Sequence, residues 1–259
     1  MDSPNIFNEN LFKGKIILIT GATSGIGYES SIALSKLGAK LIIIGRSINK
    51  LKSLKNCLEK TSKVVTYDVD LSKPNSCKNL IESLPEEWLP LNGLFHSAGD
   101  ILLKPISLSK EEEFDKLARV SLNSTLDIAR LVSKKKYFAN KSSIVLMSSI
   151  SSVLSTTGIS YYSAIKSSIN SICRSMAIEF SPREIRVNTI LAGAIETSMQ
   201  KKLESKLSSE FIDKYRNKHL LGFGEPSDIA NMVCFLLSPG SRWITGSSMI
   251  VDGGYSSFK

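Results

Sequence analysis

Seven apolar segments of strand length recur along the chain, and segments with helical spacing separate them. The apolar segments are 15–20 (KIILIT), 40–45 (KLIIIG), 63–67, 92–96, 143–148, 185–190 and 247–251, and the helical ones are roughly 25–37, 49–59, 74–84, 110–135, 161–180 and 226–237. Strands that are apolar throughout are typical of a parallel sheet with helices on both faces. The sequence therefore predicts an α/β fold with a doubly wound, seven-stranded parallel sheet.

The chain shows no internal linker or repeat, so we expect a single domain over 13–259 after a flexible, polar N-terminal lead at 1–12. The region 196–222 is rich in lysine and has no strand pattern. In doubly wound folds, the loops at the carboxyl ends of the strands cover the ligand crevice. We therefore expect 196–222 to form a helical substrate lid.

The formal charge of +9, from 33 basic and 24 acidic residues, favours anionic partners. The basic residues are scattered, which argues against a nucleic-acid binder or a membrane-surface binder. No signal-like segment and no apolar stretch of about 20 residues is present, so we expect a soluble, cytoplasmic protein. Cys57, Cys77, Cys173 and Cys234 are widely spaced, which predicts buried, reduced thiols and no metal site.

A glycine-rich segment, TGATSGIG at 20–27, lies between the first strand and the first helix. Gly21 permits a tight turn, Gly25 lets the backbone approach a pyrophosphate, and Gly27 allows close packing of helix on strand. The helix N-terminus offers free N–H groups to the anion. In this context, the segment predicts a dinucleotide site of the Rossmann type.

The second strand ends in Gly45, Arg46 and Ser47, where a carboxylate would bind the ribose hydroxyls of NAD. No acid is present to repel a 2′-phosphate, and Arg46 can pair with one. NADP(H) is therefore the preferred cofactor, with NAD(H) as the alternative. Arg46 as an ordinary surface residue also stays open.

Tyr162 and Lys166, within YYSAIK at 161–166, are four residues apart and share one face of a helix, whereas Tyr161 points away from the lysine. An ammonium beside a phenol stabilises the phenolate and lowers a pKa that starts at about 10. Tyr162 could then act as a general acid or base. The same spacing also occurs by chance on helix surfaces, so the pair alone does not decide.

Together, TGATSGIG, DVDLS at 68–72, HSAG at 96–99, Ser148–Ser149, YSAIK at 162–166 and VDGG at 251–254 resemble the motifs of the short-chain dehydrogenase/reductase family, in the family's order over about 13–256. The resemblance implies that Ser149, thirteen positions before Tyr162, orients the substrate carbonyl. It also implies that Tyr162 transfers the proton and that Lys166 holds the nicotinamide ribose and lowers the tyrosine pKa. Ser148 and Ser151 are neighbouring alternatives to Ser149.

The family's fourth catalytic residue is an asparagine, and the resemblance places Ser121 at its position. Asn123 lies about 200° further around a helix and cannot simply replace it. We expect Ser121 to support a slower or rearranged proton relay. A relative that binds nucleotide without catalysis is the alternative.

The resemblance also assigns cofactor contacts. They are Gly21, Thr23, Ser24, Gly25, Ile26 and Gly27 in the glycine-rich turn, Arg46, Asp70 and Leu71 near the adenosine, Ser97, Ala98 and Gly99, then Tyr162 and Lys166, and Ile195 and Thr197 at the nicotinamide carboxamide. Asp70 could equally be an acid at a helix N-terminus instead of a contact to the adenosine. His96 is interpreted as a structural hydrogen-bonder rather than a catalytic base. Leu191, Met199 and Phe223 are candidates for either pocket or core.

The predicted activity is reversible, metal-free hydride transfer between NADP(H) and a carbonyl or secondary alcohol. The segments 224–239 and 243–254 are most similar to the branch that contains 3-oxoacyl-acyl-carrier-protein reductases. An acidic carrier would suit the basic surface, and Arg183 is a candidate contact for it. The alternatives are a sugar, polyol or secondary-metabolite reductase and a non-catalytic NADP(H) sensor. The resemblance further implies a homotetramer or homodimer formed through 110–135 and 161–180.

Overall fold

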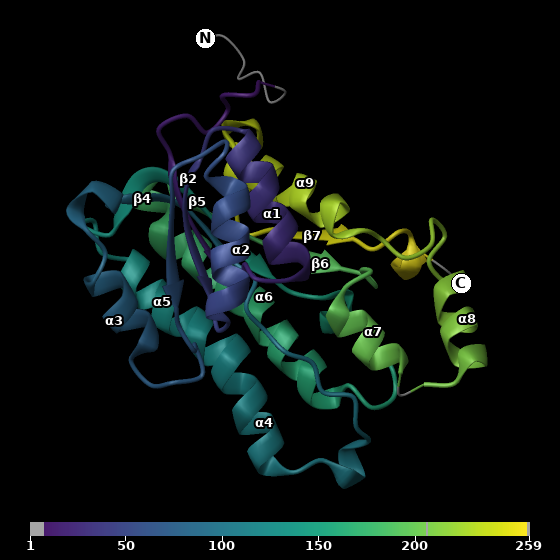
Figure 1. The fold of residues 1–259 in the computed structure, drawn as a ribbon. Coiled ribbons are helices and arrows are strands. Elements are labelled where there is room, and N and C mark those ends of the chain that lie inside the picture. Colours follow the sequence, from purple (N-terminus) through teal and green to yellow (C-terminus); the bar gives the residue numbers. More distant parts are fainter. Residues whose placement is uncertain (1–7, 206, 258–259) are drawn as a thin grey trace.

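Seven parallel strands form the central sheet in the computed structural model, which describes residues 8–205 and 207–257 (Figure 1). The strands are β1 (Ile16–Thr20), β2 (Lys40–Gly45), β3 (Val64–Asp68), β4 (Leu91–His96), β5 (Phe138–Met147), β6 (Arg186–Ala192) and β7 (Ser248–Val251), and their order in the sheet is β3-β2-β1-β4-β5-β6-β7. The predicted doubly wound sheet is confirmed. The chain reverses its direction of travel across the sheet between β1 and β4, where ligands bind in such folds.

The helices connect the strands. They are α1 (Gly25–Lys36), α2 (Ile48–Leu58), α3 (Ser76–Glu82), α4 (Glu111–Ala118), α5 (Ser124–Val132), α6 (Ser160–Phe180), α7 (Ser198–Glu204), α8 (Ser209–Asn217) and α9 (Pro226–Leu237). Helices α7 and α8 occupy most of the region predicted as a helical lid, and residue 206 of that region lies outside the described residues. Figure 1 shows α4, α7 and α8 projecting away from the sheet at one end of the molecule.

The segment predicted as one helix over 110–135 contains two helices. A turn of π-helix, Arg119–Asn123, joins α4 to α5. Hydrophobic spacing does not reveal a single π-turn, because the wider turn shifts the apolar face by only about one residue within an otherwise helical pattern. The π-turn changes the direction in which Ser121 and its neighbours project. Because the π-turn lies at the carboxyl end of the sheet, this change of direction affects the candidate site.

Each face of the sheet carries its own apolar layer. In β1, Ile17 and Ile19 pack with α1, α2 and α9, whereas Ile16 and Leu18 pack with α3, α5 and α6. This alternation follows from the two-residue period of a strand. Because both faces are buried, the strands need apolar residues at every position, which is the pattern that the sequence shows.

Residues 8–12 belong to the lead that we expected to be flexible, yet they form a turn in which Phe12 is buried and donates its backbone N–H to the carbonyl of Leu37. Residues 1–7 lie outside the described residues. Cys57 is exposed, contrary to prediction, whereas the other three cysteines are buried. In the described part of the chain, no helix has the length and apolar character needed to cross a membrane.

Candidate active site

The glycine-rich turn after β1 has the backbone that only glycine adopts easily. Gly21 and Gly25 have φ angles of 65° and 52°, and a Cβ atom at Gly27 would overlap the carbonyl oxygen of Gly21. Ser24 makes no side-chain cap, and the first turn of α1 contains no acid. The free N–H groups at this helix end therefore suit the pyrophosphate of a dinucleotide.

The end of β2 has no room for a carboxylate at position 45. A Cβ atom at Gly45 would overlap the side chain of Thr23, and Ser47 caps α2 by accepting from the backbone N–H of Lys50 at 3.4 Å. Arg46 is the residue of this turn that offers a charge to the cleft, which it lines. The geometry fits the prediction of a pocket that lacks the acid expected of an NAD site.

Asp70 follows β3 and lines the same cleft. Its Oδ1 accepts from the backbone N–H and the hydroxyl of Ser72, at 3.0 and 2.7 Å, and these bonds, with a smaller effect of Arg46, lower the pKa of Asp70. Helix α3 does not begin until Ser76. The interpretation of Asp70 as an acid at a helix N-terminus is therefore wrong, and its place in the cleft fits the adenosine side.

One continuous cleft runs along the carboxyl ends of β1, β2, β4, β5 and β6 to the lid. Most of the sequence-predicted site residues line it: Gly21, Thr23, Ser24, Gly25, Ile26, Arg46, Asp70, Leu71, Ser97, Ala98, Gly99, Ser149, Tyr162, Lys166, Ile195 and Thr197. Gly27 and Ser121 do not line it. Among the open candidates, Met199 lines the cleft, whereas Leu191 is buried in β6 and Phe223 packs against the lid.

Ser149 and Tyr162 meet at the end of the cleft. The Ser149 hydroxyl oxygen accepts from the backbone N–H of Ser151 at 3.1 Å, a contact that does not use the hydroxyl hydrogen. Ser148 is not equivalent, because its hydroxyl donates to the carbonyl of Lys166 at 3.1 Å. Burial raises the pKa of Tyr162, and a hydrogen bond with Ser149 opposes that rise.

Lys166 lies beside Tyr162 but donates elsewhere. Its Nζ atom is 2.8 Å from the carbonyl oxygen of Met147 at the end of β5 and 5.7 Å from the centre of the Tyr162 ring. Burial lowers the pKa of Lys166 to about 8. The pKa of Tyr162 is thus raised by burial, with the Ser149 hydrogen bond opposing the rise, and not lowered by this ammonium as expected.

Ser121 sits in the π-turn, buried behind the cleft. Its hydroxyl has no hydrogen-bond partner among the described residues, and its carbonyl accepts from the Thr125 hydroxyl at 2.7 Å. A Cβ atom at Gly99 would lie 3.3 Å from Ser121 Oγ and 3.5 Å from Lys166 Nζ. The hydroxyl and the ammonium thus face the same small space beside Gly99, as a proton relay between them would require.

His96 is a structural residue, as predicted. It is buried at the end of β4, with Nδ1 2.9 Å from the Thr20 hydroxyl and Nε2 3.0 Å from the Ser124 hydroxyl. Thr20 in turn accepts from the backbone N–H of Ala98 at 3.1 Å, and Ser124 donates to the carbonyl of Val120. Burial, with a smaller effect of Lys166, lowers the pKa of His96 to about 3, so it cannot act as a base at neutral pH.

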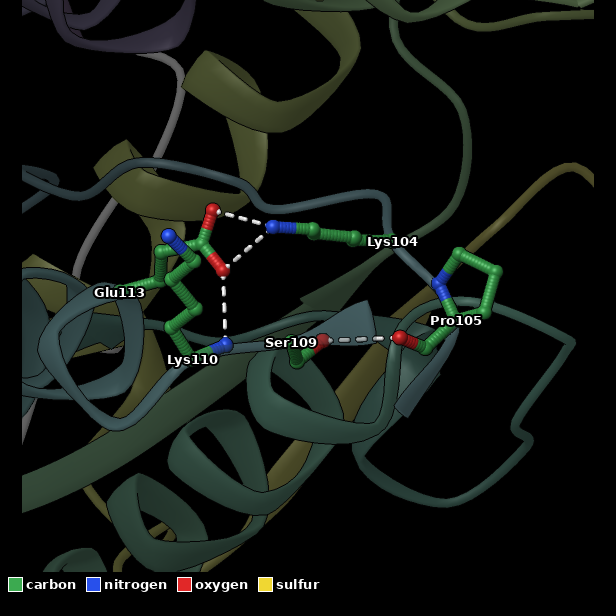
Figure 2. A network of polar contacts seen from close by, with 5 residues as sticks. All are labelled: Lys104, Pro105, Ser109, Lys110 and Glu113. Carbon is green, nitrogen blue, oxygen red and sulfur yellow. Dashed lines mark hydrogen bonds and ion pairs between the residues drawn. The ribbon is translucent and has the colours of Figure 1, made fainter. Parts of the chain in front are cut away.

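A polar network fixes the loop that follows β4 (Figure 2). Both oxygens of Glu113 accept from Lys104 Nζ at 2.8 Å, and one also accepts from the backbone N–H of Lys110 at 2.9 Å. The backbone N–H of Lys104 donates to the carbonyl of Gly158 at 2.7 Å, just before α6. The network therefore ties α4 to the start of the helix that carries Tyr162.

Tyr161, the neighbour of Tyr162, packs edge-on against Phe114 of α4, with ring centres 5.2 Å apart. It is part of the junction between α4 and α6 and does not line the cleft. Arg183 lies beyond the opposite end of α6. Its guanidinium donates to the carbonyls of Val132, Ser133 and Phe138 and to the Asn140 side chain. The Arg183 guanidinium therefore makes its hydrogen bonds within the fold.

Several contacts of the site carry no signal in the sequence. The carbonyl of Met147 that receives Lys166 is a backbone atom, and Tyr215 and Gln200 reach the cleft from the lid. Thr20 and Ser124 could have been suspected only from the unusual histidine at position 96, which needs two polar partners when it is buried. Among the described residues, no group of three or more His, Cys, Asp or Glu side chains could hold a metal ion.

Comparison with known proteins places this geometry in context. A family model described as enoyl-(acyl carrier protein) reductase matches residues 21–256. A 3-oxoacyl-acyl-carrier-protein reductase of Rickettsia felis is 34% identical over 242 residues, which cover 93% of this chain and 96% of that protein. A tropinone reductase homolog of Arabidopsis thaliana is 30% identical, with 94% of this chain and 92% of that protein covered.

Solved structures agree with this assignment. A blue fluorescent protein from a metagenomic library, in complex with NADPH, has a TM-score of 0.88 at 25% identity, with 95% of this chain and 99% of that chain covered. A short-chain type dehydrogenase/reductase from Mycobacterium ulcerans has a TM-score of 0.87 at 26% identity, with 96% and 92% covered. The motifs, the fold and these relatives agree, and the chain belongs to the short-chain dehydrogenase/reductase family of oxidoreductases.

Proposed function

We propose that the protein is an NADP(H)-dependent reductase that interconverts a carbonyl and a secondary alcohol, with a 3-oxoacyl thioester on an acidic carrier protein as its substrate. The observation that carries the proposal is the meeting of Ser149, Tyr162 and Lys166 at one end of a cleft whose other end is the glycine-rich turn. A cofactor along this cleft would present its nicotinamide end to the phenol.

In this proposal, NADP(H) supplies or accepts the hydride when bound. Tyr162 gives a proton to the substrate oxygen or takes one from it, and Ser149 donates a hydrogen bond to the same oxygen, because its contact with Ser151 does not use the hydroxyl hydrogen. Lys166 holds the nicotinamide ribose beside Tyr162. Ser121 would relay protons to Lys166 through the space beside Gly99.

The preference for NADP(H) rests on the end of β2. Position 45 cannot carry the acid that would bind ribose hydroxyls, because Thr23 fills the space, and Arg46 lines the cleft with its charge exposed. A guanidinium matches a 2′-phosphate with two hydrogen bonds. We therefore expect the exposed Arg46 guanidinium to give the site its specificity for the 2′-phosphate.

The lid supports an acyl substrate. Its residues that line the cleft are all uncharged, and they are Thr197, Ser198, Met199, Gln200, Leu203 and Tyr215. An acyl chain needs such a wall, and the net charge of +9 suits an acidic carrier. The 3-oxoacyl reductases among the relatives favour this substrate, whereas the tropinone reductase homolog favours a secondary-metabolite ketone as the second candidate.

A homotetramer or homodimer also belongs to the proposal. The helices expected to pair expose apolar side chains, with Leu126 of α5 44% exposed and Ile178 of α6 77% exposed. Burying such residues between copies would stabilise an oligomer. Sedimentation of the purified protein tests this directly, and a monomer at micromolar concentration would contradict it.

The function is tested with purified protein in two steps. Fluorescence titration with NADPH and NADH measures cofactor binding, and absorbance follows turnover with 3-oxoacyl thioesters, tropinone, keto-sugars and simple ketones. Thioester turnover that disappears in Tyr162→Phe supports the proposal. Preference for another ketone would replace the substrate, NADPH binding without turnover would favour the sensor, and no nucleotide binding would overturn the proposal.

A further inference from the structure

His219 lies where the lid meets the loop that follows β6. Its side chain is only 3% exposed, directly after α8 and its C-cap. The Nε2 atom accepts from the backbone N–H of Ala194 at 3.2 Å, and Nδ1 lies 3.0 Å from the carbonyl oxygen of Tyr215. Because a backbone N–H can only donate, Nε2 carries no hydrogen, and Nδ1–H donates to Tyr215.

The partner of each nitrogen belongs to the cleft. Ala194 lines it next to Ile195, and Tyr215 lines it from the lid. The carbonyl of Ala194 accepts from the backbone N–H of Gly224 at 2.9 Å, so both backbone polar groups of this residue are fixed. One imidazole therefore joins the loop at the nicotinamide end of the cleft to helix α8.

Aromatic rings hold the imidazole in this orientation. The Tyr255 ring stacks on it with centres 4.6 Å apart and planes at 28°, and Tyr215 and Phe223 meet it edge-on at 4.9 and 5.1 Å. Arg216 covers Phe223 at 4.0 Å and pairs with Glu196 at 3.0 Å. A buried ring with this many neighbours has one orientation, so its hydrogen bonds are pre-organised.

We propose that His219 is a positioning residue that fixes the backbone of 194–197 for the nicotinamide end of the cofactor and links that backbone to the lid. This inference rests on the proposed function, because it assumes that the cleft binds NADP(H). A histidine is suited to the role because its two nitrogens can accept from a backbone N–H and donate to a carbonyl at the same time.

The link is sensitive to protonation, because an imidazolium cannot accept the hydrogen bond from Ala194. Burial lowers the pKa of His219 from 6.5, so the link is intact at pH 7 and weakens only in acid. The charged and titratable groups that face the ring or its neighbours are Tyr215 and Arg216 of α8, Glu196 of the loop, and Asp252 and Tyr255 of the C-terminal segment. Among the effects on the His219 pKa, Asp252 raises it and Arg216 lowers it.

The test compares three variants of the full chain by NADP⁺ affinity, steady-state kinetics and melting temperature. His219→Phe keeps the packing and loses both hydrogen bonds, and we expect about a fivefold to tenfold rise in the Kd for NADP⁺, the size expected for one lost hydrogen bond. His219→Gln can place an oxygen where Nε2 lies and is expected to restore most of the affinity. Leu84→Ala removes a buried apolar side chain that does not line the cleft, and it should lower the melting temperature without changing the Kd.

A pH series separates positioning from general stability. As the pH falls through the His219 midpoint, which ¹⁵N NMR of the same protein locates, wild type should lose more NADP⁺ affinity than His219→Gln, whose amide does not titrate, while titration of the 2′-phosphate affects both alike. If wild type does not bind NADP⁺, the proposed function fails. If wild type binds and His219→Phe matches it, or the pH series of wild type and His219→Gln coincide, His219 has no positioning role. The pH comparison decides by itself if His219→Phe does not fold.

Discussion

His96 Nε2 and Ser124 Oγ lie 3.0 Å apart, and this bond joins the end of β4 to the helix that follows the π-turn. Because the Ser124 hydroxyl donates to the carbonyl of Val120, it must accept from His96. On the other side of the ring, the Thr20 hydroxyl accepts from Ala98 and donates to Nδ1. The chain of hydrogen bonds thus runs from Thr20, just before Gly21, to Val120 in the π-turn that also holds Ser121.

The two histidines of the chain should therefore be neutral in opposite tautomers. His96 carries its hydrogen on Nε2 and His219 on Nδ1, since each nitrogen's partner fixes its role. Two-dimensional ¹⁵N NMR of the protein labelled in histidine resolves both rings without interference, because there are no others. With its pKa lowered to about 3, His96 should not titrate between pH 8 and pH 5. Identical tautomers, or a His96 midpoint near 6.5, would contradict this assignment.

Ser124→Ala should destabilise the protein. The substitution leaves the buried Nε2–H of His96 without an acceptor, which costs about 1 to 3 kcal/mol of the free energy of unfolding. Urea denaturation followed by circular dichroism measures the change. Ser133→Ala, at an exposed serine at the end of the same helix, is the matched control and should stay within about 0.5 kcal/mol of wild type. Equal stability of the two variants would show that the bond contributes nothing.

The sequence predicts the strands well, because strands buried on both faces must be apolar at every position. The exception is β5, which begins at Phe138 although the pattern predicted 143. The first residues of this strand include Asn140 and Lys141, which are not buried, and Lys141 has a φ of 56°. Phe138 itself is buried, but the exposed Asn140 and Lys141 that follow it interrupt the apolar pattern at the start of the strand. The same limit applied to the π-turn, which hydrophobic spacing cannot separate from a helix.

The residues of the site also fall into those that the sequence predicts and those that it does not. Residues that line the cleft through a contiguous motif, such as Gly21 and Gly25, were predictable because their spacing reflects one local backbone shape. The neighbours of Lys166 were not, because a carbonyl such as that of Met147 has no side-chain signature. His219 was also missed, since its two hydrogen bonds depend on how the segment after α8 packs against the loop after β6. Interpretation of a sequence finds local geometry and misses contacts made across the fold.

Arg46→Asp should change the cofactor preference. The substitution replaces a guanidinium that can pair with the 2′-phosphate by a carboxylate that repels it, so we expect about a 100-fold loss of NADPH affinity. Affinity for NADH, which lacks this phosphate, should stay the same or improve. Fluorescence titration with both cofactors measures the two effects. Lys60→Asp makes the same change of charge at an exposed position after α2 that does not line the cleft. If both variants lose NADPH affinity equally, Arg46 has no specific role.

Lys166→Met should remove turnover and stabilise the fold. Burial lowers the pKa of Lys166 from its usual 10.5 to about 8, so folding disfavours its charged form. Below pH 8, the lysine is charged in both the folded and the unfolded states, and the folded state carries the full cost. As the pH rises from 8 to 10.5, the folded protein loses this proton first, and the free energy of unfolding of wild type increases.

Methionine has a similar length and no charge, so we expect Lys166→Met to be more stable than wild type by about 1 to 3 kcal/mol at pH 7. Loss of the hydrogen bond to Met147 offsets part of the gain. The difference should shrink as the pH approaches 10, whereas Lys63→Met, at an exposed lysine, should follow the wild-type curve throughout. Denaturant unfolding between pH 7 and pH 10 measures both variants, and turnover of Lys166→Met should fall at least about 100-fold. A stability curve for Lys166→Met that runs parallel to wild type would mean that the buried ammonium carries no cost, and that Lys166 is held in place without opposing the fold.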